Sequence, residues 1–171
     1  MIKIEFICHG NICRSPIAEF VMKKLVDDIG LSDEFRICSA ATSQEEIGNG
    51  VYPPVKKLLN SYHIDCSEKT AHQITQDDLE TNDYIIAMED FNLRNLYYLF
   101  PDMDKSKVYK LLDFTDTPGN IDDPWYTGEF KESFNQILKG CKALILSLAE
   151  DKLIKLSKEK KALLSNILEN Q

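Results

Sequence analysis

A strand, a turn and a helix follow one another directly at the amino-terminal end of the chain, and this order restricts the possible folds more than any other feature. Residues 2–7 are largely β-branched and aromatic, as in a strand, and they lead into the loop residues His9-Gly10-Asn11. Ser15 can cap the helix that follows, Pro16 suits its first position, and Gly30 ends it. The apolar stripe of this helix consists of Ile17, Phe20, Val21, Leu25 and Ile29.

Strands and helices continue to alternate along the chain. Apolar runs predict further strands at residues 35–41, 84–88 and 108–112. Helices are predicted from residues 53 and 75, at 91–100 and at 130–148. This order predicts an α/β fold of three layers, in which a four-stranded parallel sheet has helices on both faces. No linker or repeat divides the 171 residues into comparable halves, so we expect one domain.

The charge and the cysteine pattern exclude several classes of protein. The formal net charge of −8 would repel nucleic acid and anionic membranes on average, although a small site can still bind an anion locally. The first residues are too charged for a signal peptide, and no apolar run reaches membrane-spanning length. Five scattered cysteines fit free thiols. We therefore expect a cytoplasmic protein that neither binds nucleic acid nor inserts into a membrane.

The loop between the first strand and the first helix contains a cysteine and an arginine at a position suited to anion binding. In an open α/β sheet, ligands bind beyond the carboxyl ends of the strands, where a helix amino terminus attracts anions. Cys8 lies at this place, and an arginine fork and inward N–H groups stabilise a thiolate. Arg14 can hold two phosphoryl oxygens, and Gly10 and Asn11 allow the tight turn. Ser15 can either cap the helix or donate to the Cys8 sulfur.

Two other interpretations fit the sequence of this loop less well. Cys8 can be a small buried hydrophobe at a strand end, but Gly10 and Arg14 are then unexplained. A zinc site can be built from Cys8, His9 and Cys13, but structural zinc sites usually draw paired ligands from two places, and no second pair exists in the sequence. We therefore expect neither a metal nor a cofactor.

The extended motif Cys-x-Gly-Asn-Ile-Cys-Arg-Ser-Pro-x-Ala-Glu at residues 8–19 resembles the low-molecular-weight protein tyrosine phosphatases. The resemblance implies a Rossmann-like fold of the phosphotyrosine protein phosphatase I type. It covers residues 1–150, which leaves residues 151–171 as a charged, helical carboxy-terminal extension that is either docked or frayed. The similarity continues in the segments 39–43, 71–75, 83–88 and 122–126.

The resemblance also implies the reaction. It implies hydrolysis of phosphotyrosine in proteins, and of small aryl phosphates as in an acid phosphatase, through a cysteinyl-phosphate intermediate. Cys8 is then the nucleophile, Arg14 the phosphate clamp and Asp123, before Pro124, the general acid. The chemistry asks for an acid as well, because the leaving tyrosyl oxygen needs a proton. Asp122 is the nearest rival for this role.

Further residues are implied to surround the substrate. Trp125 and Tyr126 stand where relatives have aromatic residues that flank the substrate ring. Cys13 is implied to trap an oxidised Cys8 as a reversible disulfide, although it can also be a packing residue. The residues expected to bind the phosphate or the substrate are His9, Gly10, Asn11, Ile12, Cys13, Ser15, Glu45, Trp125 and Tyr126.

The chain departs from the family pattern at two places. Glu45 stands where many relatives have an aromatic pocket residue. With Glu46 beside it, we expect an acidic rim that disfavours phosphopeptides with acidic flanks. The family segment His-x-Ala-Arg-Gln reads Lys69-Thr70-Ala71-His72-Gln73 here, so a hydrogen bond that supports the loop is lost or is replaced by Lys69. His72 is expected on the surface or at a cap.

Three rival functions remain to be tested. An arsenate reductase would need further cysteines downstream, and residues 82–90 contain none. Phosphoarginine phosphatases tend to have threonine at the position of Ile12. An adaptor would bind a phosphorylated partner without turnover, which intact Cys8, Arg14 and Asp123 argue against. The expected partners are phosphotyrosine-containing proteins or peptides, with inorganic phosphate or other oxyanions as product-like ligands, and we expect a monomer.

Overall fold

The computed structural model describes residues 1–169 and contains four strands and seven α-helices in that range. The strands are β1 (Ile2–Cys8), β2 (Phe35–Ala41), β3 (Tyr84–Ala87) and β4 (Val108–Lys110). The helices are α1 (Arg14–Asp28), α2 (Pro53–Ser61), α3 (Gln76–Thr81), α4 (Asp90–Leu99), α5 (Pro124–Thr127), α6 (Phe130–Glu150) and α7 (Lys158–Asn166). Residues 170–171 of the expected extension lie outside the described residues.

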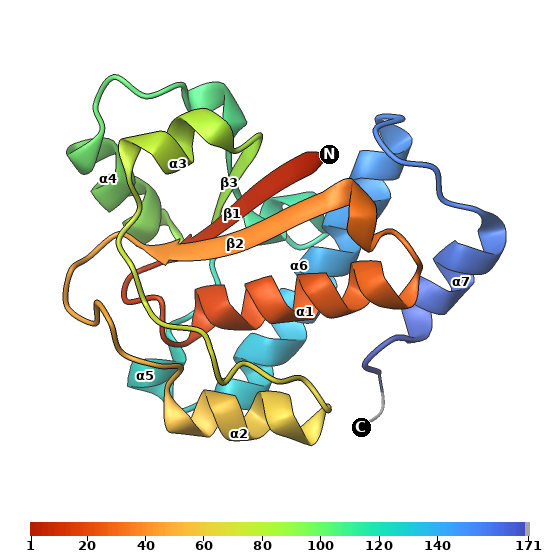
Figure 1. Ribbon diagram of the computed structural model, residues 1–171, viewed down its shortest axis with the longest axis horizontal. Coiled ribbons are helices and arrows are strands. Elements are labelled where there is room, and N and C mark those ends of the chain that lie inside the picture. The colour runs from red at the N-terminus through yellow and green to blue at the C-terminus, as the bar shows by residue number, and fades with distance from the viewer. Residues whose placement is uncertain (170–171) are drawn as a thin grey trace.

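The four strands form one parallel sheet in the order β2-β1-β3-β4 (Figure 1). β1 is therefore a central strand, paired with β2 over its whole length and with β3 in its second half. α1 and α6 cover one face of the sheet, with α2 packed against α6 on the same side, and α3 and α4 cover the other (Figure 1). The predicted three-layer α/β fold is confirmed.

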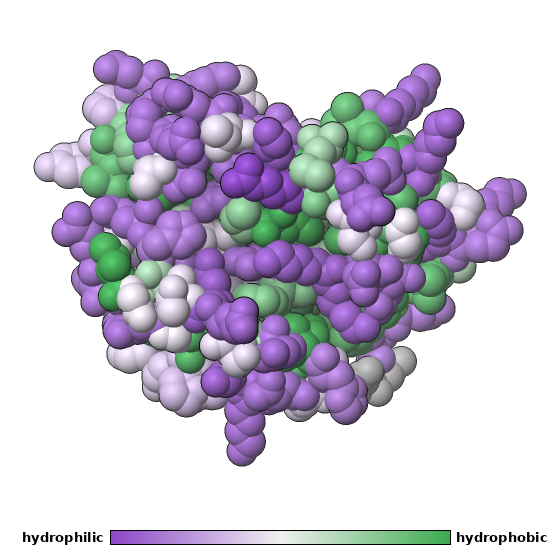
Figure 2. Space-filling model, viewed as in Figure 1, coloured by the Kyte–Doolittle hydropathy of each residue, from purple (hydrophilic) through white to green (hydrophobic). Residues whose placement is uncertain are grey.

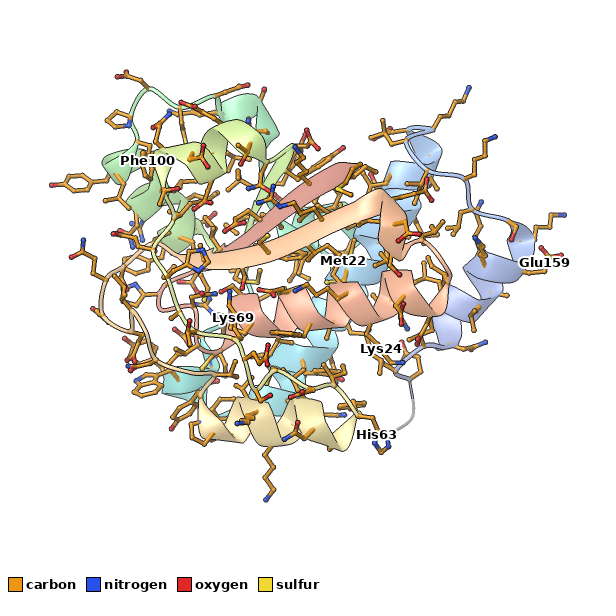
Figure 3. The ribbon with its side chains drawn as sticks, viewed as in Figure 1. Met22, Lys24, His63, Lys69, Phe100 and Glu159 are labelled. Atoms are coloured by element: carbon orange, nitrogen blue, oxygen red, sulfur yellow. The ribbon has the colours of Figure 1, made fainter. Side chains whose placement is uncertain are left out.

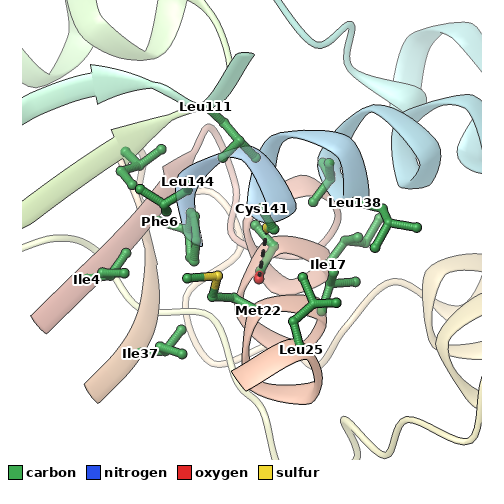
Figure 4. Packing of buried hydrophobic residues seen from close by; sticks show 14 of the residues in the cluster. Ile4, Phe6, Ile17, Met22, Leu25, Ile37, Leu111, Leu138, Cys141 and Leu144 are labelled. Carbon is green, nitrogen blue, oxygen red and sulfur yellow. Dashed lines mark hydrogen bonds between the residues drawn. The ribbon is translucent and has the colours of Figure 1, made fainter. Parts of the chain in front are cut away.

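Alternation along β1 decides which side chains meet each layer. Ile4, Phe6 and Cys8 face the large core with α1 and α6, and Ile7 faces the smaller core beneath α3 and α4. Figure 4 shows Ile4 and Phe6 packed against side chains of α1 and α6. The same alternation brings the Cys8 sulfur to the side of the sheet where α1 begins.

α6 approaches the sheet closely because it carries a glycine where it crosses the residues after β4. A Cβ atom added at Gly140 would lie 2.5 Å from Leu111 Cγ, which is closer than packed atoms approach. One residue along, the Cys141 thiol points at the Ala18 carbonyl of α1 (Figure 4). α6 is thus wedged between α1 and the end of the sheet.

Three local predictions need correction. Cys13, not Ser15, is the N-cap residue of α1, and Pro16 lies at its third position, because the Ser15 hydroxyl bonds within the loop instead. The fourth strand ends at Lys110, since the chain turns into a 3₁₀ helix at Leu111–Phe114. The predicted order of elements also lacks the short helix α5, which lies between this 3₁₀ helix and α6.

The carboxy-terminal segment is docked on the domain. α7 lies beside α6 (Figure 1), and Leu164, Ile167 and Leu168 are buried in the main core cluster. Lys142 of α6 donates to the Ser165 carbonyl oxygen at 3.1 Å. The face of the molecule in Figure 2 is mostly hydrophilic, with hydrophobic side chains scattered over it. Within residues 1–169, no helix has the length and apolar character required to cross a membrane.

Candidate active site

Cys8 ends β1 with its sulfur held by the loop that follows. The residue is only 3% exposed. Its Sγ lies 3.0 Å from Ser15 Oγ and accepts a hydrogen bond from the Asn11 backbone N–H at 3.3 Å. The loop thus curls around the sulfur and brings donors to it, an arrangement that stabilises negative charge.

Asn11 fixes the direction of the Ser15 hydroxyl. Its backbone has a φ of 59°, a left-handed conformation that asparagine tolerates better than most residues. Its side-chain amide donates to Ser15 Oγ at 2.7 Å and to Ser39 Oγ at 2.9 Å. Because Ser15 accepts from Asn11, its own proton is free to point at the Cys8 sulfur. Of the two roles considered for Ser15, the structure shows the contact with the sulfur.

A buried polar network continues behind the loop. Ser39 Oγ donates to Glu19 Oε1 at 2.6 Å, and Lys69 Nζ lies 3.1 Å from the same oxygen. Burial alone would raise the pKa of Glu19, but Lys69 and the hydrogen bonds from Lys23 and Ser39 outweigh it and lower this pKa. Lys69 therefore supports the loop indirectly, through Glu19 and Ser39.

Arg14 is buried at the start of α1, with its guanidinium held from three sides. Nη1 donates to Glu89 Oε2 at 2.6 Å and to the Ile121 carbonyl oxygen at 2.8 Å. Nη2 donates to Asp123 Oδ2 at 3.1 Å. Burial alone would lower the pKa of Arg14, but the negative charges of Cys8, Asp123 and Glu89 raise it. The guanidinium is thus a fixed cation at the site.

Glu89 was not predicted as a site residue. It lies two residues after β3 and is the N-cap of α4, where its side chain and that of Asn92 form a capping box. A carboxylate just beyond a central, mostly buried strand was the available signal, because the carboxyl ends of the strands line the site in this class of fold. Nothing in the local sequence shows that its partner is Arg14.

Asp123 sits on a loop that is tied to the end of β3. The Ile121 N–H donates to the Met88 carbonyl oxygen at 2.9 Å. Asp123 caps α5 by accepting from the Trp125 N–H at 3.0 Å through Oδ1, while Oδ2 faces Arg14. Asp122 does not line the cavity above Cys8, whereas Asp123 does.

A cavity of about 110 Å³ opens above the Cys8 sulfur. Its walls come from the loop, the start of α1, the segment after β2 and the segment around α5. The lining residues are Cys8, His9, Gly10, Ile12, Cys13, Arg14, Glu45, Glu46, Asp123, Trp125 and Tyr126. Of the residues predicted to bind substrate, only Asn11 and Ser15 are not in this lining, and both contact Cys8 from below.

The rim of the cavity is aromatic on one side and acidic on the other. Trp125 and Tyr126 are 51% and 82% exposed, and the Trp125 ring packs on Tyr52 at a centroid distance of 4.8 Å. Opposite them, Glu45 Oε2 lies 3.0 Å from His9 Nε2. Glu46, which was expected beside Glu45 at the rim, also lines the cavity.

Cys13 is buried in the cavity wall. Burial raises the pKa of its thiol well above its ordinary value, and the charges of Cys8 and Asp123 add to this. Within residues 1–169, the donor atoms of Cys8, His9 and Cys13 do not gather as metal ligands would. All five cysteines are free.

Most of the chain matches a known protein family. Residues 3–155 match the family model described as low molecular weight phosphotyrosine protein phosphatase. A relative from Rattus norvegicus, named low molecular weight phosphotyrosine protein phosphatase, is 42% identical over 149 residues, covering 83% of this chain and 92% of the relative.

Solved structures agree in fold and length. The crystal structure of YfkJ from Bacillus subtilis superposes with a TM-score of 0.85 at 34% identity, covering 89% of this chain and 97% of that one. The structure of SP-PTP, a low molecular weight protein tyrosine phosphatase from Streptococcus pyogenes, has a TM-score of 0.78 at 38% identity. It covers 98% of this chain and 99% of its own, so the similarity includes the region of α7.

Proposed function

The chain belongs to the low molecular weight phosphotyrosine protein phosphatase family and is therefore a phosphotyrosine protein phosphatase, and we propose that it works through a cysteinyl-phosphate intermediate. In this proposal Cys8 is the nucleophile, Arg14 is the phosphate clamp and Asp123 is the general acid and base. The observation that carries it is one cavity that Cys8, Arg14 and Asp123 line together, with Arg14 Nη2 3.1 Å from Asp123 Oδ2.

Binding of the phosphoryl group rearranges the contacts of Arg14. A phosphate dianion above Cys8 competes with Asp123 for Nη2, while Glu89 and the Ile121 carbonyl keep Nη1 in place. The anion also places negative charge beside Asp123. A carboxyl group next to a like charge binds a proton more tightly, so substrate binding prepares Asp123 as an acid.

The first chemical step forms a bond between the Cys8 sulfur and phosphorus. The bond from phosphorus to the tyrosyl oxygen breaks, and Asp123 gives its proton to that oxygen. In the second step Asp123 takes a proton from water, the oxygen attacks phosphorus, and the bond to sulfur breaks. Inorganic phosphate leaves and Cys8 is again a thiolate.

The rim favours an aryl phosphate. The phosphate must reach a sulfur at the floor of the cavity, and Trp125 and Tyr126 stand beside the entrance, where they can flank a ring. Glu45 and Glu46 give the other side a negative potential. We propose phosphotyrosine proteins with few acidic residues near the modified tyrosine as substrates.

Turnover of a phosphotyrosine peptide, measured as phosphate released, tests the function. The wild-type protein should turn over many equivalents, and Cys8→Ser should abolish turnover while it keeps affinity for inorganic phosphate. An adaptor would bind the peptide and release no phosphate. Faster phosphate release from phosphoarginine than from phosphotyrosine would indicate a phosphoarginine phosphatase. Arsenate reduction coupled to a thiol would indicate an arsenate reductase.

We propose that residues 1–150 form the phosphatase domain and that residues 151–171 form an extension, which contributes Ile154 and Leu164 to the core. The enzyme is proposed to act as a cytoplasmic monomer. Gel filtration at micromolar concentration tests the monomer.

A further inference from the structure

Glu5 is a carboxyl group buried in the middle of the sheet. It lies on the central strand β1 and is 1% exposed. Its Oε1 has no hydrogen-bond partner among the described residues. Since side chains alternate along a strand, Glu5 points to the α3 side of the sheet and Cys8 to the α1 side. A buried carboxyl oxygen without a partner is unfavourable unless a cation or a proton meets it.

Two potential metal ligands face this oxygen. His72 Nε2 lies 3.9 Å from Glu5 Oε1, and Asp78 offers a carboxylate oxygen, so that the three donor atoms lie within 4.8 Å of one another. Both backbones are fixed. The His72 carbonyl oxygen accepts from the Ala41 N–H at the end of β2, and Asp78 belongs to the capping box of α3 with Thr75.

The charges around Glu5 leave this oxygen without a cation. The Lys69 ammonium is directed at Glu19 instead, at 3.1 Å. Among the described residues, Glu5 therefore has carboxylates and an imidazole as neighbours but no ammonium or guanidinium bonded to Oε1.

We propose that Glu5, His72 and Asp78 form a binding site for a divalent transition metal ion of the class of Zn²⁺. One imidazole nitrogen and two carboxylate oxygens suit this class of ion. Donor atoms around a tetrahedral zinc ion lie roughly 3.3–3.5 Å apart, so side-chain rotations must bring the three donors, which lie within 4.8 Å of one another, about 1 Å closer together. His72 is half exposed, which leaves the ion an entry path and room for water as a fourth ligand.

Such an ion would be structural. It would link β1, the segment around Gln73 that bridges to Ala41 at the end of β2, and the first turn of α3, on the face of the sheet that α3 covers. The proposal does not depend on the phosphatase activity. A test can therefore use protein in which the reactive thiol has been removed.

Calorimetric titration of the folded Cys8→Ser protein with Zn²⁺ tests the site. We expect one ion bound per chain. Loss of an outer partner of a metal ligand weakens binding by about 10–100-fold, so Glu5→Gln and His72→Gln should each weaken it by roughly 100-fold or more. His63→Gln is the matched control, because His63 lies at the end of α2, far from Lys69 and the start of α1 (Figure 3), and should leave the affinity unchanged.

A Co²⁺ spectrum of the same proteins separates this site from the cysteines, including Cys38, which pairs with Glu5 across β1 and β2. Nitrogen and oxygen ligands give weak visible bands only, whereas a thiolate ligand adds an intense charge-transfer band. His72→Gln changes a half-exposed side chain, so it remains informative if Glu5→Gln fails to fold. Unchanged Zn²⁺ affinity in His72→Gln, a thiolate spectrum, or no binding at millimolar Zn²⁺ would overturn the proposal.

Discussion

Arg14 Nη1 donates to Glu89 Oε2 at 2.6 Å, across 75 residues of chain. Together with the Ile121 carbonyl, this contact holds Nη1, so the guanidinium exchanges partners through Nη2, which faces Asp123, and through Nε. The fork of the clamp is therefore oriented before any anion arrives. Prepositioning of this kind lowers the entropy cost of reaching the transition state.

Glu89→Gln should lower kcat/KM for p-nitrophenyl phosphate by about 10- to 100-fold, since small misplacements of a clamp have effects of this size. Glu89 acts through Arg14, so it is a positioning residue. Inorganic phosphate should therefore inhibit the variant more weakly than the wild-type protein. Asp90→Asn is the matched control, because Asp90 is exposed and pairs with Lys110. Equal losses in both variants would count against the positioning role.

Asp123→Asn should slow hydrolysis of aryl phosphates by about two to three orders of magnitude, the usual effect of losing a general acid. The loss should be smaller for substrates whose leaving group needs no proton. Asp122→Asn should retain most activity, because Asp122 lies outside the cavity lining. If Asp122→Asn shows the large loss instead, the acid must be reassigned.

Ser15→Ala should slow alkylation of Cys8 by iodoacetate at neutral pH. A hydrogen bond to a charged group contributes about 1.5–3 kcal/mol, so its loss disfavours the thiolate relative to the thiol by up to roughly 100-fold, and the rate falls with the thiolate fraction. Ser61→Ala, an exposed serine at the end of α2, serves as the control. An unchanged alkylation rate in Ser15→Ala would show that the hydroxyl contributes little to the thiolate.

Cys13→Ser should make peroxide inactivation harder to reverse. The pKa of Cys13 is raised, so its thiol stays protonated at neutral pH and peroxide attacks Cys8 first. Cys13 then captures the oxidised Cys8 as a disulfide, which dithiothreitol reduces. Recovery of activity after a brief peroxide pulse is the measurement, with Cys38→Ser as control. The same recovery in all three proteins would reject the protective role.

Glu19→Gln should destabilise the protein at neutral pH, and the difference should shrink in acid. The pKa of Glu19 is lower in the folded protein than its ordinary value of 4.5, so its contribution is present above that pH and is lost as the pH falls through the folded value. Removing one partner of a buried ion pair costs roughly 3 kcal/mol. Urea unfolding from pH 7 down to about pH 3 checks this.

The control for Glu19 is Asp28→Asn, which removes an ion pair with Lys24 on the outer side of the same helix. Pairs four residues apart on a helix contribute only about 0.3–0.5 kcal/mol. A pH profile of Glu19→Gln that runs parallel to that of the wild-type protein between pH 7 and about pH 3 would contradict the assignment.

Periodicity predicted the order of strands and helices because each segment carries its own pattern. The buried run at β3 and the stripe of α6 were both visible in this way. The sequence pattern did not show which partner wins when two groups compete for one hydrogen bond. The Ser15 hydroxyl could serve either the helix or the sulfur, and only the amide of Asn11, which occupies its acceptor side, shows which.

The sequence by itself determined what depends on neighbours in the chain: a strand that ends at Cys8, a tight loop, and a helix that carries Arg14 back to the same point. Only the tertiary structure decided that Glu89 holds Arg14, that Leu111 leaves no room for a side chain at position 140, and that Glu5 meets His72. The reason is physical. Local patterns fix backbone conformation, whereas contacts between distant segments depend on how the layers pack and on which buried charges find a partner.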